Sequence, residues 1–331
     1  MKNSARALIE INSACDASRK VGLRIEVDVS NDQRYLRRMP YRTLISAEEL
    51  NAIIDEPHVV VLDARFDIDS EAQAVINFND GHIPRAQQAD VSLHMAGEIV
   101  PGVTGRRPLP VKSTFTQTLR DWGIDESSQV VIYDDMNGIM AASRLWTMLK
   151  WAGLDSVALL DGGYQAWLAA GLPLTTETAT VARSTYEPKF LDDVYIHLPE
   201  IEAASQSGDL LIFDSRSLSD GVPSHDAVKG HIPGSRAADR AFNSTPDGLN
   251  WRSSEELRVH FLALIGERNP SEVVFYCGSG ITAAQNMLGM AHAGFDGCRM
   301  YIGSWSEWII DSNRPVDDSW EIGESGPGVE V

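Results

Sequence analysis

The chain has 331 residues, of which 43% are hydrophobic and 23% charged, a composition that suits two soluble globular domains, each with its own core. Its 28 Lys and Arg residues against 47 Asp and Glu residues give a net charge of −19, which argues against nucleic acid or an acidic membrane surface as a partner. No apolar run approaches the about 20 residues that a membrane-spanning helix needs.

The cysteines and the N-terminal segment give the first expectations about location. Cys15, Cys277 and Cys298 are few, odd in number and without metal-type spacing. This usage fits a reducing compartment with at least one free thiol, and we expect neither a metal nor another cofactor. Residues 1–42 mix both charges and lack the apolar segment of a signal peptide, so we expect a poorly ordered N-terminal extension and a cytoplasmic protein.

Short apolar strands alternate with helical patterns over residues 43–174. Strands are expected from Val59, from Val130 and over Val157–Leu160, and helices over Ala47–Ile54, Phe115–Trp122, Ala141–Trp151 and Tyr164–Ala170. This alternation predicts an α/β domain with a parallel sheet covered by helices on both faces. Residues 175–192, which begin with a Thr-rich stretch, are the expected linker, and the Gly-rich residues 319–331 are the expected tail.

Residues 193–318 repeat the landmarks of the first domain in the same order. The matching segments are Val59–Arg65 with Leu210–Arg216, Gly81–Pro84 with Gly230–Pro233, Val130–Asp134 with Val273–Cys277, and Gly163–Trp167 with Ser304–Trp308. Four matches in one order indicate a duplicated domain. The first copy has Asp134 where the second has Cys277, so we expect the first domain to line one side of the site rather than to act as a second catalyst.

The segment around Cys277 carries the strongest indication of chemistry. An expected buried strand, Val273–Tyr276, ends directly before it, and helix formers follow Thr282. Gly278 and Gly280 allow the sharp turn between them. A thiol surrounded by loop amides and a helix N-terminus has a lowered pKa, which predicts a nucleophile. The alternative is a small apolar Cys at the end of a strand.

Several motifs resemble the two-domain rhodanese family of sulfurtransferases. They are the paired Gly-His-Ile-Pro sequences, Gly105–Pro110, Leu160–Gly163 and Gly303–Trp308. The resemblance covers roughly residues 43–318 and implies tandem rhodanese-like domains, an inactive first one and a catalytic second one. The loop Cys277–Thr282 resembles the 3-mercaptopyruvate sulfurtransferase branch, whereas the thiosulfate branch usually carries basic side chains in this loop.

The resemblance implies a double displacement at Cys277. The thiolate takes a sulfane sulfur from 3-mercaptopyruvate or a similar small anionic donor, and the persulfide passes it to cyanide, a small thiol or a protein thiol such as thioredoxin. The amides of the loop, including Gly278, Gly280 and Ile281, would hold the persulfide. The hydroxyls of Ser279 and Thr282 would donate hydrogen bonds to the thiolate or donor; a plain helix N-cap is the alternative for Thr282.

Donor binding is expected from arginine. Arg216 follows the strand that ends at Asp214 and resembles the arginine that binds the donor carboxylate in this family, because its guanidinium forms a fork that matches a carboxylate. An ion pair between Arg216 and Asp214 is the alternative. The mercaptopyruvate branch normally has a second arginine soon after this one, and this chain lacks it.

A second departure concerns a proposed Ser-His-Asp relay. This chain has Arg107 in place of the histidine, and Ser92 near the place of the aspartate, so Ser279 is given no relay role. We hypothesise that Arg107, together with Arg106, reaches the interdomain cleft and binds the donor anion. The alternative is a solvated surface position for both arginines.

Several alternative functions and residue roles are also compatible with parts of the sequence. Thiosulfate:cyanide sulfurtransferase and a non-enzymatic persulfide carrier are the alternatives for function. A phosphatase with the Cys-x5-Arg pattern is disfavoured, because this chain has Ala283 at the arginine position. His82 and His231 recur in both halves, including the one without a thiol, so we interpret them as structural. A resolving disulfide between Cys298 and Cys277 is a minor alternative.

Overall fold

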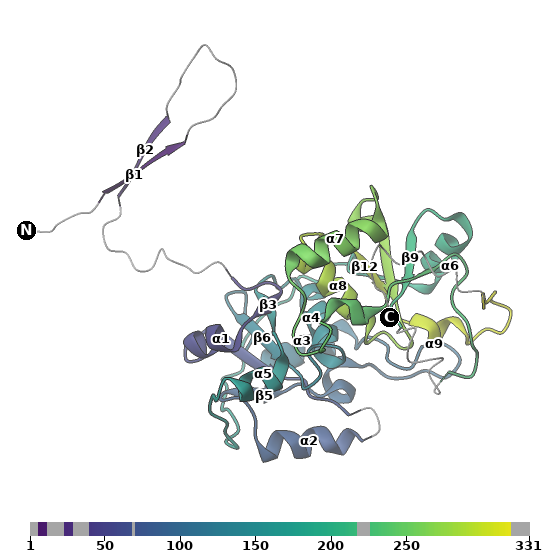
Figure 1. Ribbon diagram of the computed structural model, residues 1–331. Coiled ribbons are helices and arrows are strands. Elements are labelled where there is room, and N and C mark those ends of the chain that lie inside the picture. The colour runs from purple at the N-terminus through teal and green to yellow at the C-terminus, as the bar shows by residue number, and fades with distance from the viewer. Residues whose placement is uncertain (1–5, 12–22, 29–39, 68–69, 217–225, 319–331) are drawn as a thin grey trace, which may run out of the picture. The chain divides into compact units, whose positions relative to one another are not determined.

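The computed structural model of the protein describes residues 6–11, 23–28, 40–67, 70–216 and 226–318, and divides the chain into two units, residues 1–40 and 41–331. In the first unit β1 (Arg6–Ile11) pairs antiparallel with β2 (Leu23–Asp28) (Figure 1). The sequence prediction of a poorly ordered extension did not include this hairpin, although β2 alternates apolar and charged residues as strands do. The other residues before 40, and the expected tail 319–331, lie outside the described residues.

The second unit contains two five-stranded sheets with the same strand order, and all their pairs are parallel. The first has the order β3-β7-β6-β4-β5, formed by β3 (Leu44–Ile45), β7 (Val157–Leu160), β6 (Gln129–Tyr133), β4 (Val59–Asp63) and β5 (Ala86–Gln88). The second has the order β8-β12-β11-β9-β10, formed by β8 (Tyr195–Ile196), β12 (Arg299–Tyr301), β11 (Val273–Tyr276), β9 (Leu211–Asp214) and β10 (Arg236–Ala237). This correspondence confirms the predicted duplication and the tandem α/β fold.

Helices connect the strands in both halves (Figure 1). The first half has α1 (Ala47–Ile53), α2 (Glu71–Asp80), the π-helical turn η1 (Val91–Met95), α3 (Lys112–Asp121), α4 (Ala141–Trp151) and α5 (Gly163–Ala169). The second has α6 (Leu198–Ser207), the 3-10 turns η2 (Arg240–Asn243) and η3 (Pro270–Glu272), α7 (Ser254–Ile265), α8 (Ala283–His292) and α9 (Ser304–Trp308). The predicted bounds of α4 and β7 agree with the structure, whereas α2 was not predicted.

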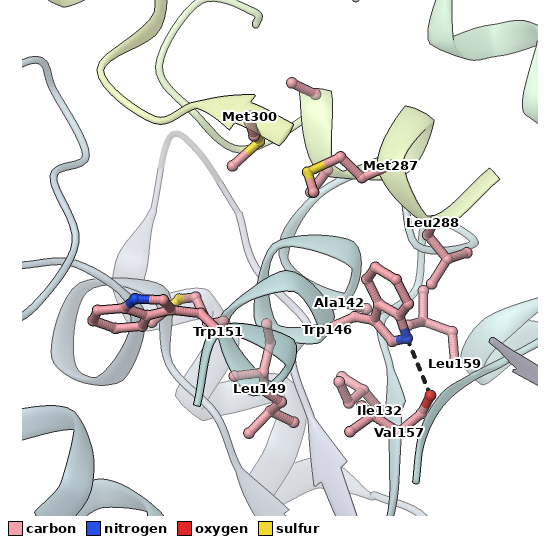
Figure 2. Packing of buried hydrophobic residues seen from close by; sticks show 14 of the residues in the cluster. Ile132, Ala142, Trp146, Leu149, Trp151, Val157, Leu159, Met287, Leu288 and Met300 are labelled. Atoms are coloured by element: carbon pink, nitrogen blue, oxygen red, sulfur yellow. Dashed lines mark hydrogen bonds between the residues drawn. The ribbon is translucent and has the colours of Figure 1, made fainter. Parts of the chain in front are cut away.

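Both faces of each sheet are buried, as parallel sheets require. In the first sheet Leu62 and Val130 belong to one apolar cluster, while Val61 and Val131 belong to another on the opposite face. The first of these clusters extends through α4 and α8 into the second half. In Figure 2, Trp146 and Leu149 of α4 share this core with Met287 and Leu288 of α8, and the indole of Trp146 donates a hydrogen bond to the carbonyl of Val157 (3.0 Å). The two halves therefore share one core.

The fold brings the predicted site residues to one edge of the second sheet. Tyr276, at the end of β11, lies beside Asp214, at the end of β9, and the two strands run in the same direction. Cys277 and Arg216, which follow these ends, therefore emerge at the same carboxyl edge. In open α/β sheets this edge is where ligands bind.

Candidate active site

The loop from Cys277 to Thr282 connects β11 to α8 and surrounds the thiol. Cys277 is 1% exposed, while Gly278, Ser279 and Thr282 are partly exposed above it. Gly280 has φ +77°, and a Cβ at this position would lie 2.2 Å from the carbonyl oxygen of Ile302. Only glycine fits that conformation and that close approach, so the loop is built to turn tightly around the sulfur.

Hydrogen bonds make the thiol acidic. Burial raises the pKa of Cys277, but the hydrogen bond from the Thr282 hydroxyl and those from the amides of Ala283, Ser279 and Gly280 lower it by more, so the net shift is downward. Thr282 occupies the N-cap position of α8 without a side-chain capping bond. Its hydroxyl interacts with the thiol instead, and the arrangement favours the nucleophilic thiolate.

The other predicted cradle residues contribute in different ways. Gly278 accepts a hydrogen bond through its carbonyl from the amide of Ser306 (2.9 Å), which ties the loop to α9. The side chain of Ile281 is buried in the apolar core shared by the two halves. The amide of Ser279 is one of the donors that lower the pKa of Cys277, and the role expected for its hydroxyl stays a prediction.

Ser304 is a site residue that the sequence analysis missed. Its Oγ accepts a hydrogen bond from the amide of Cys277 (3.2 Å) and lies 3.9 Å from the sulfur. Ser304 has φ +54°, a conformation that is unusual for any residue other than glycine. Gly163, its counterpart in the first half, has φ +57°. A serine where the duplicated position is glycine was the available signal, because it costs backbone strain at the site.

Arg216 is engaged inside the protein. Its Nε and Nη2 donate to the carboxylate of Asp214 at 2.6–3.0 Å, and Nη2 also donates to the carbonyl of Gly230 (2.6 Å). Arg65 makes the same contacts with Asp63 in the first half. The ion-pair alternative is therefore present in the structure. Nη1 of Arg216 has no hydrogen-bond partner among the described residues. It is therefore the nitrogen of this guanidinium that is left to bind the carboxylate of a sulfur donor.

Of the two neighbouring arginines, Arg106 rather than Arg107 lies against the cysteine loop. Arg107 donates from Nη1 to the Oγ of Ser92 (3.0 Å), in the two positions where the resemblance placed a relay. Nη2 of Arg106 would lie 3.3 Å from a Cβ on Gly278, and Nη1 forms an ion pair with Asp226. The side chain of Asp226 is fully buried, whereas that of Arg106 is 40% exposed, so one end of the guanidinium is fixed and the other is accessible.

The two repeated histidines make contacts that fit the structural interpretation. His82 is buried, and its ring nitrogens lie 2.8 Å from the carbonyl oxygen of Phe78 and 3.2 Å from that of Glu177. The Nδ1 of His231 lies 3.1 Å from the carbonyl oxygen of Ile232. Neither ring is directed at Cys277 by any of these contacts.

Cys298 contrasts with Cys277. Both are free and buried. Burial, with a smaller contribution from Asp296, raises the pKa of Cys298 to about 12, so this thiol is neutral and unreactive at neutral pH. Among the described residues no cluster of three or more His, Cys, Asp or Glu side chains could hold a metal ion. No helix in the described ranges has the length and apolar character needed to cross a bilayer.

The fold and the site define a duplicated α/β protein with an acidic, amide-cradled cysteine in its second copy. The chain belongs to the rhodanese-like domain family, which matches residues 46–170 and 198–311. Both ranges fall inside the predicted domains 43–174 and 193–318, whose outer boundaries stay predictions. The enzyme is a sulfurtransferase, the activity for which relatives that match most of this chain are named.

Three relatives illustrate the family. A probable 3-mercaptopyruvate sulfurtransferase of Pseudomonas aeruginosa is 39% identical over 82% of this chain and 97% of its own length. A putative thiosulfate sulfurtransferase of Mycobacterium tuberculosis is 33% identical over 83% of this chain and 96% of its own length. The solved structure of 3-mercaptopyruvate sulfurtransferase from Leishmania major superposes with a TM-score of 0.70 at 28% identity, over 82% of this chain and 75% of that one.

Proposed function

We propose that the enzyme transfers a sulfane sulfur from 3-mercaptopyruvate, or a similar small anionic donor, through a persulfide on Cys277 to a thiophilic acceptor. The observation that carries the proposal is the cradle in which one hydroxyl and three amides hydrogen-bond the thiol and lower its pKa. The printed name of the Pseudomonas aeruginosa relative supports the donor.

In the first half-reaction the Cys277 thiolate attacks the sulfur of the donor. The new S–S bond forms as the C–S bond of the donor breaks. The electron pair of the C–S bond stays on the carbon, so the leaving group is the enolate of pyruvate. The proton of the donor thiol passes to that carbon, which leaves pyruvate and an anionic Cys277 persulfide. The loop amides of Ser279, Gly280 and Ala283 are already directed at this position, so the cradle needs no reorganisation to hold the charge.

In the second half-reaction an acceptor nucleophile attacks the outer sulfur. The S–S bond breaks, its electrons return to Cys277 as thiolate, and the acceptor leaves with the sulfur. Cyanide, a small thiol or a protein thiol such as thioredoxin has the required chemistry. The proposal includes a cytoplasmic setting, which the sparse and odd-numbered cysteines support.

Binding of the donor carboxylate is assigned to the arginines beside the loop. Arg106 is the stronger candidate, because its guanidinium lies against Gly278 and Asp226 holds one end of it. The Nη1 of Arg216 is the second candidate. The hypothesis that Arg107 binds the sulfur donor stays open. Arg107 would either keep its hydrogen bond to Ser92 while binding the donor or exchange that bond for one to the donor.

Thiosulfate is the alternative donor. The Mycobacterium tuberculosis relative is named for it, and Arg106 brings a positive charge to a loop that has none of its own. A non-enzymatic persulfide carrier, the further alternative from the sequence, would require the same cradle, and the relatives named as sulfurtransferases argue against it. These readings differ in the donor that loads Cys277 and in whether the sulfur turns over.

A donor panel tests the proposal. Wild type and Cys277→Ser are assayed with mercaptopyruvate and with thiosulfate, using cyanide as acceptor over many turnovers. We expect catalytic thiocyanate formation from mercaptopyruvate with wild type alone. Preference for thiosulfate would select the alternative donor, and a single equivalent of thiocyanate per chain would select a carrier. Activity that survives Cys277→Ser would refute the mechanism.

A further inference from the structure

Arg144 is a fully buried cation in the domain without a thiol. It lies on α4, is 0% exposed, and its guanidinium donates only to main-chain carbonyls. The acceptors in the first half are Met95 (2.7 and 3.2 Å), Arg107 (3.0 Å) and Pro108 (3.3 Å). The remaining nitrogen, Nη1, crosses to the second half and donates to the carbonyl of Gly280, inside the cysteine loop.

The charge of Arg144 has no carboxylate partner among the described residues. A buried ion without a counter-ion is strongly unfavourable. Its charged and titratable neighbours are Tyr195, Cys277 and Arg107. Arg107 is a second cation, and burial raises the pKa of the Tyr195 phenol to about 12, so that group is neutral at neutral pH. Among the described residues, the Cys277 thiol is therefore the neighbour of Arg144 that can supply a negative charge.

The packing of α4 on α8 fixes this arrangement. Side chains from both helices meet in the shared core (Figure 2). Arg144 extends from α4 to the carbonyl of Gly280, and the amide of the same residue is one of the donors to the Cys277 sulfur. The guanidinium is thus fully buried and joined to the cysteine loop through the carbonyl of Gly280.

We propose that Arg144 is a positioning residue for sulfur transfer, supplied by the first domain. Its charge compensates the anionic sulfur on Cys277, and its hydrogen bond fixes the Gly280 peptide so that the loop amides are directed at that sulfur. The inference rests on the proposed function of Cys277 as the sulfur carrier. It gives the first domain, which has no nucleophile, a direct electrostatic part in the reaction.

The thiol pKa tests the proposal without any donor. The alkylation rate of Cys277 by iodoacetamide is measured against pH, with peptide mass spectrometry to separate Cys277 from Cys298. Loss of a neighbouring positive charge disfavours a thiolate, so Arg144→Gln is expected to raise the pKa of Cys277 by about one unit. Sulfur transfer at a pH below that pKa then falls about tenfold, with the thiolate fraction.

Two variants serve as controls. Arg144→Lys keeps the charge and should restore most of the wild-type pH profile. Tyr195→Phe perturbs the same buried region by removing the hydroxyl that contacts Thr147 (2.9 Å), yet it removes no charge at neutral pH and should leave the profile unchanged. A folded Arg144→Gln protein with the wild-type alkylation profile would overturn the proposal and leave the persulfide mechanism untouched.

A measurement that leaves Arg144 in place covers the case in which its variants do not fold. The folded pKa of Cys277 is lowered, so its thiolate stabilises the protein above the unfolded pKa, and this stabilisation is lost as pH falls through the folded pKa. The melting temperature of wild type relative to Cys277→Ser should therefore rise with pH. Parallel melting curves at every pH would show that the folded pKa of Cys277 is not lowered, and would remove the thiolate that Arg144 is proposed to compensate.

Discussion

The loop that follows β6 (the first loop, from Asp134) and the loop that follows β11 (the second loop, from Cys277) each direct main-chain amides at one acidic side chain. In the first loop one carboxylate oxygen of Asp134 accepts hydrogen bonds from the amides of Met136 (3.0 Å) and Gly138 (2.7 Å), and the other from the amide of Ala142 (3.3 Å). Burial raises the pKa of Asp134 to about 6 against these bonds, so it is mostly ionised at neutral pH. In the second loop the corresponding group is the Cys277 thiol, whose pKa the surrounding hydrogen-bond donors lower.

The loops differ in how they are covered. Asn137 of the first loop is 4% exposed and contacts the carbonyl of Gly248 in the second half (3.4 Å). The guanidinium of Arg106, from the first half, approaches the second loop at Gly278, and Gly105 lies against Gly303 before α9, where a Cβ on Gly105 would come 2.6 Å from the carbonyl of Gly303. The fold thus provides an anion cradle twice, and only the copy with a thiol and a neighbouring accessible cation is equipped for transfer.

Moving the nucleophile to the first loop is the strongest challenge to this comparison. We expect Asp134→Cys in a Cys277→Ser background to stay about 10⁴-fold or more below wild type in sulfur transfer. The first loop has Met140 at the N-cap position where the second has Thr282, so it lacks the hydroxyl donor, and its Asn137 is buried against the second half. Recovery of activity to within tenfold of wild type would show that the loops are equivalent.

The Thr282 hydroxyl should account for the next largest effect. Thr282→Val removes one preorganised donor to the sulfur and should lower kcat by about 10²-fold. The pKa of Cys277 should rise, because the hydrogen bond that favours the thiolate is lost, so the acidic limb of the pH–rate profile should move to higher pH. Thr282→Ser keeps the hydroxyl and is the matched control; equal profiles for the Val and Ser variants would remove Thr282 from the mechanism.

Arg106 and Arg107 are the candidates for binding the sulfur donor, so we expect their substitution to change the KM for that donor. Arg106→Ala should raise the KM for the donor about tenfold with a smaller change in kcat, because a charge-assisted contact is lost. Arg107→Ala tests the hypothesis from the sequence, and an unchanged KM in that variant would remove Arg107 from the donor site. An unchanged KM in Arg106→Ala would show that the guanidinium beside Gly278 has no role in recognition of the sulfur donor.

The smallest expected effect is at Ser304, the serine of the second half that corresponds to Gly163 in the first half. Ser304→Gly copies Gly163 and relieves a positive φ, so it should gain about 1 kcal/mol or less in the free energy of unfolding. Activity should fall several-fold, because the acceptor for the Cys277 amide is gone. Ser304→Ala keeps the strain and serves as the control. A Ser304→Gly enzyme with full activity would show that the hydroxyl is dispensable.

Local patterns predicted most of the fold and the centre of the site. Strand β11, the turn at Gly280 and the position of Cys277 all follow from neighbours in sequence, and the duplication follows from motif order. Helix α2 was missed because its sequence is largely polar, with Val75 and Ile76 more than 40% exposed.

The contacts that Arg144 and Arg106 make beside the cysteine loop arise only from the tertiary structure, although the sequence hypothesis named Arg106 together with Arg107. Arg144 lies 136 positions from Gly280 along the chain, and Arg106 lies 120 positions from Asp226. No periodicity or motif reports such contacts. The mismatch between Gly163 and Ser304 is the exception, since it can be read by aligning the two halves of the sequence.

The central claim is that the Cys277 thiolate accepts a sulfur atom. Incubation of the enzyme with mercaptopyruvate in the absence of acceptor, followed by peptide mass spectrometry, tests it most directly. The account predicts the mass of one added sulfur on the peptide that contains Cys277, and its complete removal by cyanide. No added mass on that peptide with mercaptopyruvate, thiosulfate or any other sulfane donor, or added sulfur on Cys298 instead, would contradict it.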